Sequence, residues 1–332
     1  SWLLRNTDLE HGKAGWNPPK TSRYEPLERF CVEAPGFNGR RNSPSLRRFS
    51  KAFPLRAVSM VPWNPKEIVY VGEALETSTG PVLAETDAGK AVIKTLGNNE
   101  GPHALVREWV GTKAAQLLGL CTFDMAILII PKGVKIQIGK GKIAESGPAI
   151  AFRFENGVEW NGDKSLLNRA VNKLDFARIM LLDTWVLNYD RCPPPGNKTW
   201  QPNYQNVFLK KDDSDGTRLS VITMDHSHAF NGLTIGERLT RIDMVKNQDI
   251  IGQFPQAKRF YSNSDFALGC KRVQSISESE VDEMVREVPR EWEFGERECE
   301  FMKNFLLDRA RVVGDPLYWS GVFKPIAGRL PI

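Results

Sequence analysis

The sequence predicts an α+β protein of two lobes, a strand-rich lobe followed by a mainly helical lobe. Short apolar segments of strand length, separated by turn residues, fill residues 65–158 with one helix among them. Helical periodicity dominates residues 159–332, and a chain of 332 residues can bury a core in each lobe. Residues 1–64 are rich in Pro, Gly, Asn, Ser and Arg without a sustained period, which indicates a basic, irregular N-terminal extension.

The strand-rich lobe begins with a hairpin signal. The turn sequence Asp87-Ala88-Gly89 separates two apolar segments, as expected for a hairpin. Further along the chain, a helical pattern begins near His103 and ends at Gly119. A lysine-rich stretch between the last two strands is expected to form a second hairpin. The expected elements are strands at 68–71, 80–86, 90–94, 125–130 and 149–154, a helix at 103–118 and the lysine-rich hairpin at 132–143.

The helical lobe contains one exception to its helical pattern, a pair of strands joined across an acidic turn at 212–216. The boundary between the lobes falls near residues 155–162, and we expect a cleft there. The expected elements are helices at 164–188, 236–246, 278–288 and 294–313 and strands at 206–210 and 219–224.

Composition favours a globular protein with no membrane contact. Hydrophobic residues make up 41% of the chain, and no apolar run approaches the length of about 20 residues that a membrane span requires. Residues 1–5 lack the features of a secretory signal, and the five cysteines are scattered without metal-ligand spacing. We therefore expect a cytoplasmic protein with free thiols.

The formal charge of +5 is concentrated in the extension. Residues 1–60 hold 11 Lys and Arg against 5 Asp and Glu, so the rest of the chain carries about −1. We interpret this basic segment as a solvated arm. Contact with nucleic acid or with an acidic partner is the alternative interpretation.

A turn rich in small residues lies between the first two strands. The backbone N–H groups of such a turn can point at phosphate oxygens, and its hydroxyl groups add further donors. The same composition is typical of a plain hairpin loop, so both interpretations stand. The candidate phosphate-binding residues are Thr77, Ser78, Thr79 and Gly80.

Lys94 ends a strand on the same face as the apolar Val92, and from there its ammonium group can hold phosphates in a cleft. A solvated lysine at a strand end is the alternative. Glu108 favours the first interpretation, because its small helical neighbours let the helix approach a strand closely enough for a Lys94–Glu108 ion pair. A solvated Glu108 would instead lie opposite Arg107 and Lys113. The small neighbours are Ala104, Gly111, Thr112 and Ala115.

Three polar residues follow anchored elements of the helical lobe. Asp190 comes after an apolar helix, where a rigid carboxylate can accept or orient the proton of an attacking hydroxyl, although an isolated Asp often only serves a polar turn. Asn206 opens a strand and Asp225 ends the next, and Mg²⁺ prefers such oxygen ligands. This order is typical of a phosphotransferase that uses metal-bound ATP. His226 and His228 offer a zinc site as the alternative, but no third ligand lies at a suitable spacing.

These segments together resemble the HipA-like kinases, a bacterial branch of the protein-kinase-like fold that shares features with the phosphoinositide kinases. The resemblance runs from about residue 71 to residue 230, with five segments in the family's order. They are Thr79-Gly80-Pro81-Val82-Leu83 with Val92-Ile93-Lys94, Gly101-Pro102-His103-Ala104-Leu105-Val106-Arg107-Glu108, Asn188-Tyr189-Asp190-Arg191, Asn206-Val207-Phe208-Leu209, and Asp225-His226-Ser227-His228-Ala229.

The resemblance implies a role for each matching residue. Lys94 would bind the phosphates of ATP with Glu108 as its partner, and Asp190 would be the catalytic acid/base. Asn206 and Asp225 would bind Mg²⁺. The segment 151–155 looks like the hinge that contacts adenine, which makes Phe152, Phe154 and Glu155 candidate nucleotide-binding residues.

The chain also departs from the family's pattern. A long insert at 192–205, with three prolines and Trp200, separates Asp190 from Asn206, so Asn197 and Asn203 are alternative metal ligands. His226 and Ser227 differ from the Phe-Gly of ordinary protein kinases but are similar to this family, and the extension at 1–64 has no assigned counterpart.

The activity implied by the resemblance is transfer of a phosphoryl group to Ser or Thr of a protein substrate. Some HipA-like proteins are toxins of toxin–antitoxin pairs, which implies an antitoxin partner and a role in growth arrest. A kinase that acts on a small molecule or a lipid and a non-catalytic scaffold are the alternatives.

Overall fold

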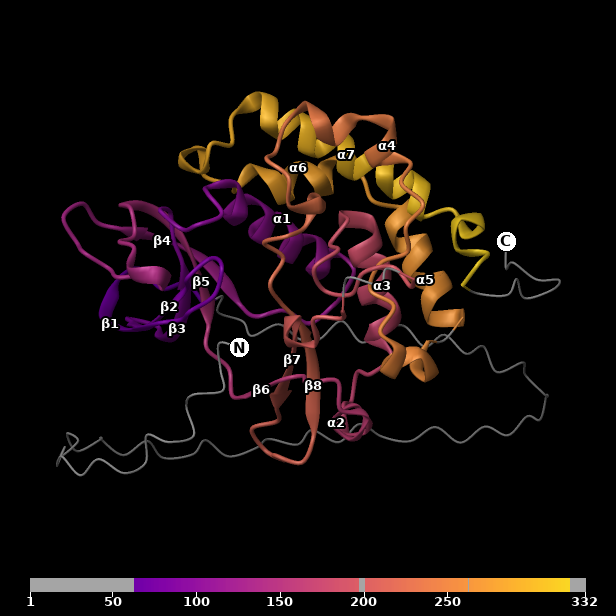
Figure 1. Ribbon diagram of the computed structural model, residues 1–332, viewed down its shortest axis with the longest axis horizontal. Helices are drawn as coiled ribbons and strands as arrows, with labels where there is room; N and C mark the ends of the chain where they lie inside the picture. The colour runs from indigo at the N-terminus through magenta and orange to yellow at the C-terminus, as the bar shows by residue number, and fades with distance from the viewer. Residues whose placement is uncertain (1–62, 197–200, 262, 323–332) are drawn as a thin grey trace, which may run out of the picture. The chain divides into compact units, whose positions relative to one another are not determined.

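The computed structural model describes residues 63–196, 201–261 and 263–322. Within these residues the chain forms a five-stranded sheet, a three-stranded sheet and seven α-helices (Figure 1). The strand-rich part precedes the helical part, so the predicted α+β class with two lobes is confirmed. The extension expected at 1–64 lies almost entirely outside the described residues and stays a prediction.

The sheet of the first lobe is antiparallel throughout. Its β2–β3 hairpin turns at Gly89, whose φ of +102° suits glycine, and the Thr86 hydroxyl donates to the Gly89 carbonyl at 2.7 Å. The strand order is β1-β2-β3-β5-β4. The strands are β1 (Ile68–Ala74), β2 (Val82–Thr86), β3 (Gly89–Lys94), β4 (Met125–Ile130) and β5 (Gly147–Arg153).

Alternation along β3 separates the two faces of this sheet. Val92 packs into the larger hydrophobic core beside α1 (His103–Leu117), whereas Ala91 and Ile93 belong to a smaller core on the other face. Lys94 bonds to α1, so the predicted pairing of Val92 and Lys94 on one face is confirmed.

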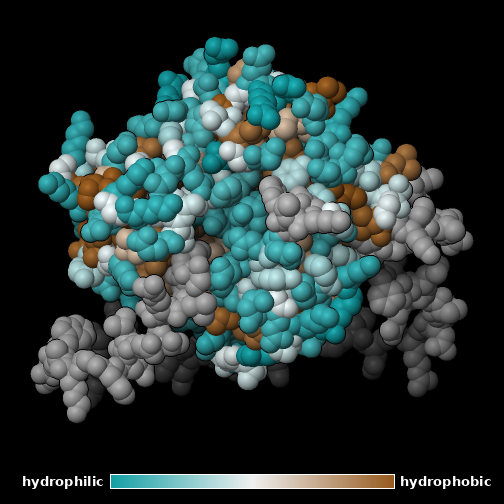
Figure 2. All heavy atoms as spheres, viewed as in Figure 1, coloured by the Kyte–Doolittle hydropathy of each residue, from teal (hydrophilic) through white to brown (hydrophobic). Residues whose placement is uncertain are grey.

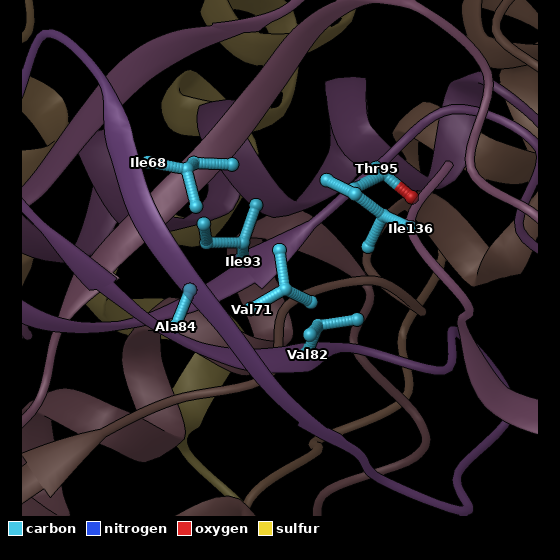
Figure 3. Close-up of a pocket in the computed structure, with 7 residues that line it drawn as sticks. All are labelled: Ile68, Val71, Val82, Ala84, Ile93, Thr95 and Ile136. Atoms are coloured by element: carbon cyan, nitrogen blue, oxygen red, sulfur yellow. The ribbon is translucent and has the colours of Figure 1, made fainter. Parts of the chain in front are cut away.

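Figure 3 shows a hollow within the smaller core, on the face of the sheet opposite Lys94. Its walls are apolar except for the Thr95 hydroxyl, and it has no room for a water molecule. We therefore assign it no ligand. The lining residues are Ile68, Val71, Val82, Ala84, Ile93, Thr95 and Ile136.

The lysine-rich connection between β4 and β5 reverses direction without two regular strands. A single isolated bridge joins Gln137 to Ile143, and the chain turns through Lys140, whose φ is +60°. Ile136 and Ile138 are buried in the smaller core and hold the loop to the sheet. The predicted hairpin is therefore present as a short antiparallel reversal, although its two arms are too short to form regular strands.

Residues 154–156 connect the two sheets, because β5 ends at Arg153 in the first and the next strand begins at Gly157 in the second. The second sheet is antiparallel and has the order β6-β7-β8. Its first strand was not predicted, because three residues are too few for a periodic pattern. The strands are β6 (Gly157–Glu159), β7 (Val207–Lys211) and β8 (Leu219–Thr223).

The helix predicted at 164–188 is interrupted by a contact with β8. The Asn172 side chain accepts the N–H of Val221 at 2.7 Å and donates to its carbonyl at 2.9 Å, so the chain leaves the helical path there. Instead of the single helix predicted at 236–246, the chain forms a 3₁₀ turn followed by a short helix. The helix α5 was not predicted. The helices are α2 (Lys164–Arg169), α3 (Asp175–Val186), α4 (Ile242–Val245), α5 (Asn263–Gln274), α6 (Glu278–Arg286) and α7 (Glu296–Val313).

The end of α3 is firmly anchored. Every residue of this helix except Arg178 is buried, and the Trp185 indole donates to the Leu306 carbonyl of α7 at 3.0 Å. Leu187 then takes a left-handed conformation with φ of +51°, which ends the helix. The segment that leads to Asp190 therefore starts from a fixed point.

Polar residues cover most of the surface seen in Figure 2, and apolar residues form small separate patches on it. Val69 and Tyr70 of the edge strand β1 are exposed, as is Ile129 of the edge strand β4. No helix within the described ranges combines the length and the hydrophobicity that a membrane span needs.

Candidate active site

Three charged side chains from three elements meet at the end of β3. The Nζ atom of Lys94 lies 2.7 Å from a carboxylate oxygen of Glu108 in α1 and 3.0 Å from one of Asp225, which follows β8. The other oxygen of Glu108 accepts the N–H of His226 at 3.2 Å. Glu108 therefore joins the lysine of the first lobe to the backbone of the second, and the ion pair expected from the small face of α1 is present.

Burial and mutual charge decide the protonation of these groups. Burial alone would lower the pKa of Lys94, but the carboxylates of Asp225 and Glu108 outweigh burial and raise it. Burial raises the pKa of Glu108, and Lys94 opposes that shift. Burial would also raise the pKa of Asp225, yet Lys94 outweighs it and holds the pKa below the ordinary value. Lys94 is therefore a cation and Asp225 an anion at neutral pH.

The small face of α1 lets the helix lie against the chain that follows β8. A Cβ atom on Gly111 would lie 2.5 Å from the Cβ of His226, which is closer than real side chains come. Glycine is thus required at the point where the two segments touch. This close approach brings Glu108, three residues earlier in the helix, to Lys94 and to the His226 N–H.

Asp190 lies beside two asparagine side chains. One of its carboxylate oxygens accepts the side-chain amide of Asn206 at 2.7 Å and that of Asn203 at 3.3 Å. The Asn203 N–H donates to the Arg191 carbonyl at 2.9 Å, so the insert at 192–205 returns to the residue next to Asp190. Asn203 and Asn206 both stay candidate metal ligands, whereas Asn197 lies outside the described residues.

The wholly buried Arg191 bonds to the segments that carry Asn206 and Asp225. Its guanidinium forms an ion pair with Asp183 of α3, and it donates to the Met224 carbonyl at 2.8 Å and to the Asn206 carbonyl at 3.3 Å. The Met224 N–H in turn donates to the Asn206 carbonyl at 3.3 Å. Asp190, Asn206 and Asp225 are therefore each next to, or part of, a segment that Arg191 holds.

The donor set around Asp225 and Asn206 fits a divalent cation such as Mg²⁺. Among the described residues, Asp225 uses Oδ1 for Lys94 and for the Ser227 hydroxyl, and Asn206 uses its amide nitrogen for Asp190. One oxygen of each side chain is left for a cation. Mg²⁺ is commonly held by one or two such protein oxygens together with phosphate oxygens and water.

The residues expected to bind phosphates lie in a tight turn. The N–H of Thr77 donates to the Leu75 carbonyl at 2.9 Å and that of Gly80 to the Thr77 carbonyl at 3.2 Å, so these two donors serve the turn itself. Thr79 is buried, and Ser78 is the exposed member of the set.

The residues expected to contact adenine lie at the junction of the two sheets. Phe152 is buried in the larger core and Phe154 packs partly against it, while Glu155 forms an ion pair with Lys210 of β7 at 2.6 Å. The N–H of Phe154 donates to the Lys90 carbonyl at 2.9 Å. The segment is therefore a connection between the lobes in the position of a hinge.

The zinc alternative at His226 and His228 finds no support. Among the residues that the structure describes, no group of three or more His, Cys, Asp or Glu side chains is arranged to hold a metal ion. His226 is buried, with Nδ1 3.2 Å from the Arg191 guanidinium, and burial lowers its pKa well below the ordinary value. His228 points elsewhere, with Nε2 3.6 Å from Glu100 and Nδ1 4.0 Å from Asp190.

Sequence reasoning missed several side chains that organise this site. Arg107, next to Glu108, donates to the carbonyls of Ser227 and Leu233, and His103 accepts the Ile235 N–H at 2.7 Å. Both side chains hold the segment after Asp225 against α1. Their location on the same helix as Glu108 was the only local signal, because each of these three bonds joins residues more than 100 positions apart.

The model of the HipA-like kinase family matches residues 68–320. The chain belongs to this family. The match covers both lobes and includes every residue of the site described above, and family membership makes the chain a kinase by class, that is, a phosphotransferase. No curated protein sequence matches the chain.

Solved kinase structures show a weaker likeness. The proinflammatory kinase CtkA of Helicobacter pylori is 12% identical with a TM-score of 0.47, over 76% of this chain and 97% of that one. A Golgi casein kinase with Mn and ADP bound is 12% identical with a TM-score of 0.42, over 76% of this chain and 74% of that one. A second Golgi casein kinase structure is 11% identical with a TM-score of 0.45, over 80% and 74%. The assignment to the HipA-like kinases rests on the family match alone.

Proposed function

We propose that this chain is an ATP- and Mg²⁺-dependent kinase that transfers the γ-phosphoryl group to a Ser or Thr hydroxyl of a protein. The observation that carries the proposal is the meeting of Lys94, Glu108 and Asp225 at one point. Lys94 and Glu108 are buried and Asp225 is partly buried. Removing charged groups from water is costly unless they are paired, and a scaffold has no need of them. Asp190 and the two asparagines beside it complete an acidic site that suits phosphoryl transfer.

Each residue has a distinct task in this proposal. Lys94 neutralises charge on the α and β phosphates, and Glu108 fixes the position of the lysine. Asp190 orients the acceptor hydroxyl and accepts its proton, held in place by the Asn206 amide at 2.7 Å. Asn206 and Asp225 would hold Mg²⁺, which supplies charge neutralisation on the phosphate oxygens when bound.

The nucleotide would lie between the hinge and the turn at 77–80. Phe152, Phe154 and Glu155 mark the adenine end, and Lys94 marks the phosphate end of the same sheet. Ser78 is the exposed hydroxyl of the turn and is the donor best able to reach a phosphate. A toxin role, an antitoxin partner and nucleic acid binding by the basic arm stay predictions.

The test is transfer of radiolabel from [γ-³²P]ATP in a lysate that is then separated into protein and small-molecule fractions. We expect label on Ser or Thr of proteins with the wild-type chain in the presence of Mg²⁺. Asp190→Asn should lose this transfer by a factor of about 10² or more, because it removes the proton acceptor. Asp213→Asn, an exposed aspartate in the turn between β7 and β8, is the matched control and should transfer normally.

The other outcomes contradict the proposal in distinct ways. Label in the small-molecule fraction alone would show that the acceptor is not a protein. ATP binding that is indifferent to Mg²⁺, with equal background label for wild type and Asp190→Asn, would show that the chain is a scaffold.

A further inference from the structure

The loop between β4 and β5, residues 131–146, carries an unusual concentration of free positive charge. We call it the lysine loop. It holds four lysines and a single glutamate, Glu145, and all four lysine side chains are exposed. No ion pair joins any of them to another residue within the described ranges. The lysines are Lys132, Lys135, Lys140 and Lys142.

The base of the lysine loop is well ordered although its tip is exposed. The Ile138 N–H donates to the Lys142 carbonyl and the Ala144 N–H to the Ile136 carbonyl, both at 2.8 Å. The side chains of Ile136 and Ile138 are buried in the smaller core. The four ammonium groups therefore extend from a fixed platform, which reduces the entropy lost when a partner binds them.

The lysine loop also touches the turn that would cover the phosphates. The Gly139 N–H donates to the Gly80 carbonyl at 3.4 Å, and the Lys140 N–H donates to the Glu76 carboxylate at 3.3 Å. A Cβ atom on Gly80 would lie 2.6 Å from the Gly139 nitrogen, so the two backbones are in direct contact. A partner bound to the lysine loop would therefore lie next to residues 75–81.

The register of the sheet places this contact at the phosphate end of the lobe. Lys94 pairs with Ile150 near the start of β5, whereas Ala91 pairs with Arg153 at its end, where the hinge begins. Ile130 pairs with Gly147, so the lysine loop leaves the sheet at the same end as Lys94. If adenine lies at the hinge, the acceptor approaches from the end that carries the lysine loop.

We propose that the lysine loop docks an acidic segment of the protein acceptor and so directs the kinase to sites flanked by Asp and Glu. This inference rests on the proposed function, because it uses the same phosphate end and the same class of acceptor. Four unpaired cations attract an acidic chain and raise its association rate. Val134 and Ile143 are exposed among the lysines and provide apolar contacts that suit a peptide.

The composition of the loop favours a protein over a nucleic acid. Proteins that bind single strands combine positive charge with aromatic side chains for base stacking and often use Arg. The lysine loop contains neither an aromatic residue nor an arginine. Glu76, which lies beside Lys140, and Glu145, near the end of the loop, would also repel a continuous phosphate backbone, whereas a peptide can place its acidic residues opposite the lysines alone.

The test measures binding of fluorescein-labelled peptides of about twelve residues to the full chain by fluorescence anisotropy, at about 50 mM and 300 mM salt. One peptide has a central Ser flanked by Glu, and its partner peptide has Gln in place of every Glu. The wild-type chain should bind the acidic peptide about tenfold more tightly than the neutral one at low salt, and this preference should shrink at high salt.

The decisive variant replaces the four lysines of the loop with Gln. It should lose the preference for the acidic peptide. The control variant replaces four exposed lysines of the helical lobe with Gln and should keep the preference. These lysines are Lys164, Lys246, Lys258 and Lys271. Both variants lose the same charge, so net charge alone cannot explain a difference. Binding of a fluorescent ATP analogue should be equal in both, which shows that the lobes remain folded.

Three results would overturn the docking proposal. The first is an equal loss of the preference for the acidic peptide in both variants, and the second is the absence of this preference in the wild type. The third is full displacement of the acidic peptide by an unlabelled single-stranded RNA, together with loss of RNA binding in the loop variant. Failure of the proposed function looks different, since no peptide would then be phosphorylated while the loop-dependent preference in binding persists.

Discussion

Arg191 shows how a single residue can hold the geometry of this site. It is fully buried and donates to two carbonyl groups, at Asn206 and at Met224, while its charge is balanced by Asp183. A guanidinium makes these bonds in fixed directions, which a lysine ammonium cannot do. Arg191 therefore ties the two ends of the long insert together, because it directly follows Asp190 and bonds to the Asn206 carbonyl.

Arg191→Lys should weaken the Mg²⁺-dependent part of nucleotide binding. The variant keeps a positive charge near Asp183 but cannot reach all three acceptors, so the segments that carry Asn206 and Asp225 lose their support. We expect the affinity for a non-hydrolysable ATP analogue in saturating Mg²⁺ to fall by a factor of about 10, with a smaller change when Mg²⁺ is absent. Isothermal titration calorimetry measures both values.

Arg309→Lys is the matched control for this variant. Arg309 is also fully buried and donates to backbone carbonyls, among them Thr184 at 2.7 Å and Val245 at 2.9 Å, but it touches none of the site residues. It should lower the free energy of unfolding and leave the Mg²⁺ dependence of binding unchanged. If both variants alter that dependence equally, Arg191 has no special role in positioning.

At the scale of elements, the contact of α1 with the segment after β8 controls the site. Gly111 lies against His226, and Glu108 uses both of its oxygens between Lys94 and the His226 N–H. A shift of α1 away from this segment would lengthen the bond between Glu108 and the His226 N–H and move the carboxylate that positions Lys94. The distance between α1 and the segment after β8 therefore helps to determine where the Glu108 carboxylate lies relative to the Lys94 ammonium group.

Gly111→Ala should destabilise the chain although alanine favours a helix. The gain in helix propensity is about 1 kcal/mol, but the new methyl group would overlap the Cβ of His226, which is fixed to the backbone. We expect a net loss of about 1–3 kcal/mol in the free energy of unfolding, measured by urea denaturation, and weaker binding of ATP.

Gly269→Ala in α5 separates helix propensity from the clash. A methyl group there would meet the Cδ2 atom of Leu181, the movable end of a side chain. This variant should be neutral or slightly stabilised and should bind ATP normally. A Gly111→Ala chain as stable as Gly269→Ala would show that α1 can move away from His226 without cost.

Local patterns in the sequence predicted the elements that carry Lys94 and Glu108, because alternation in β3 and the small face of α1 are properties of adjacent residues. They did not predict the break before α3, since Asn172 leaves the helix to pair with Val221, 49 residues later. The role of Arg191 was equally hidden, because its acceptor at Met224 lies 33 residues away. Contacts that form only after folding have no periodic signal.

At the scale of the whole described chain, α1 and β5 are joined to a short segment before α7. The Trp292 indole donates to the Pro148 carbonyl of β5 at 2.9 Å, and its ring meets Trp109 of α1 edge-on. His103 Nε2 lies 3.0 Å from the Glu293 carbonyl, and Lys113 pairs with Glu287 at 2.7 Å. The strand-rich lobe is thus held to the helical lobe on the α1 side as well as through residues 154–156.

Trp292→Phe should loosen this second connection while filling most of the same space. The variant loses one buried hydrogen bond and leaves the Pro148 carbonyl without its donor, which costs about 1–3 kcal/mol. Because the bond joins the two lobes, nucleotide affinity should fall about fivefold as well, since ATP must contact both lobes at once. Urea denaturation and calorimetric titration measure the two effects.

Trp319→Phe tests whether that effect depends on the location of the bond. Trp319 is also buried, and its indole donates to the Val313 carbonyl at 2.7 Å, entirely within the helical lobe. The two variants remove the same chemical bond, so they should lose similar stability, but only Trp292→Phe should weaken nucleotide binding. Equal nucleotide affinities in the two variants would mean that the α1 side connection does not align the lobes, and that residues 154–156 and the ion pairs of Lys94 suffice.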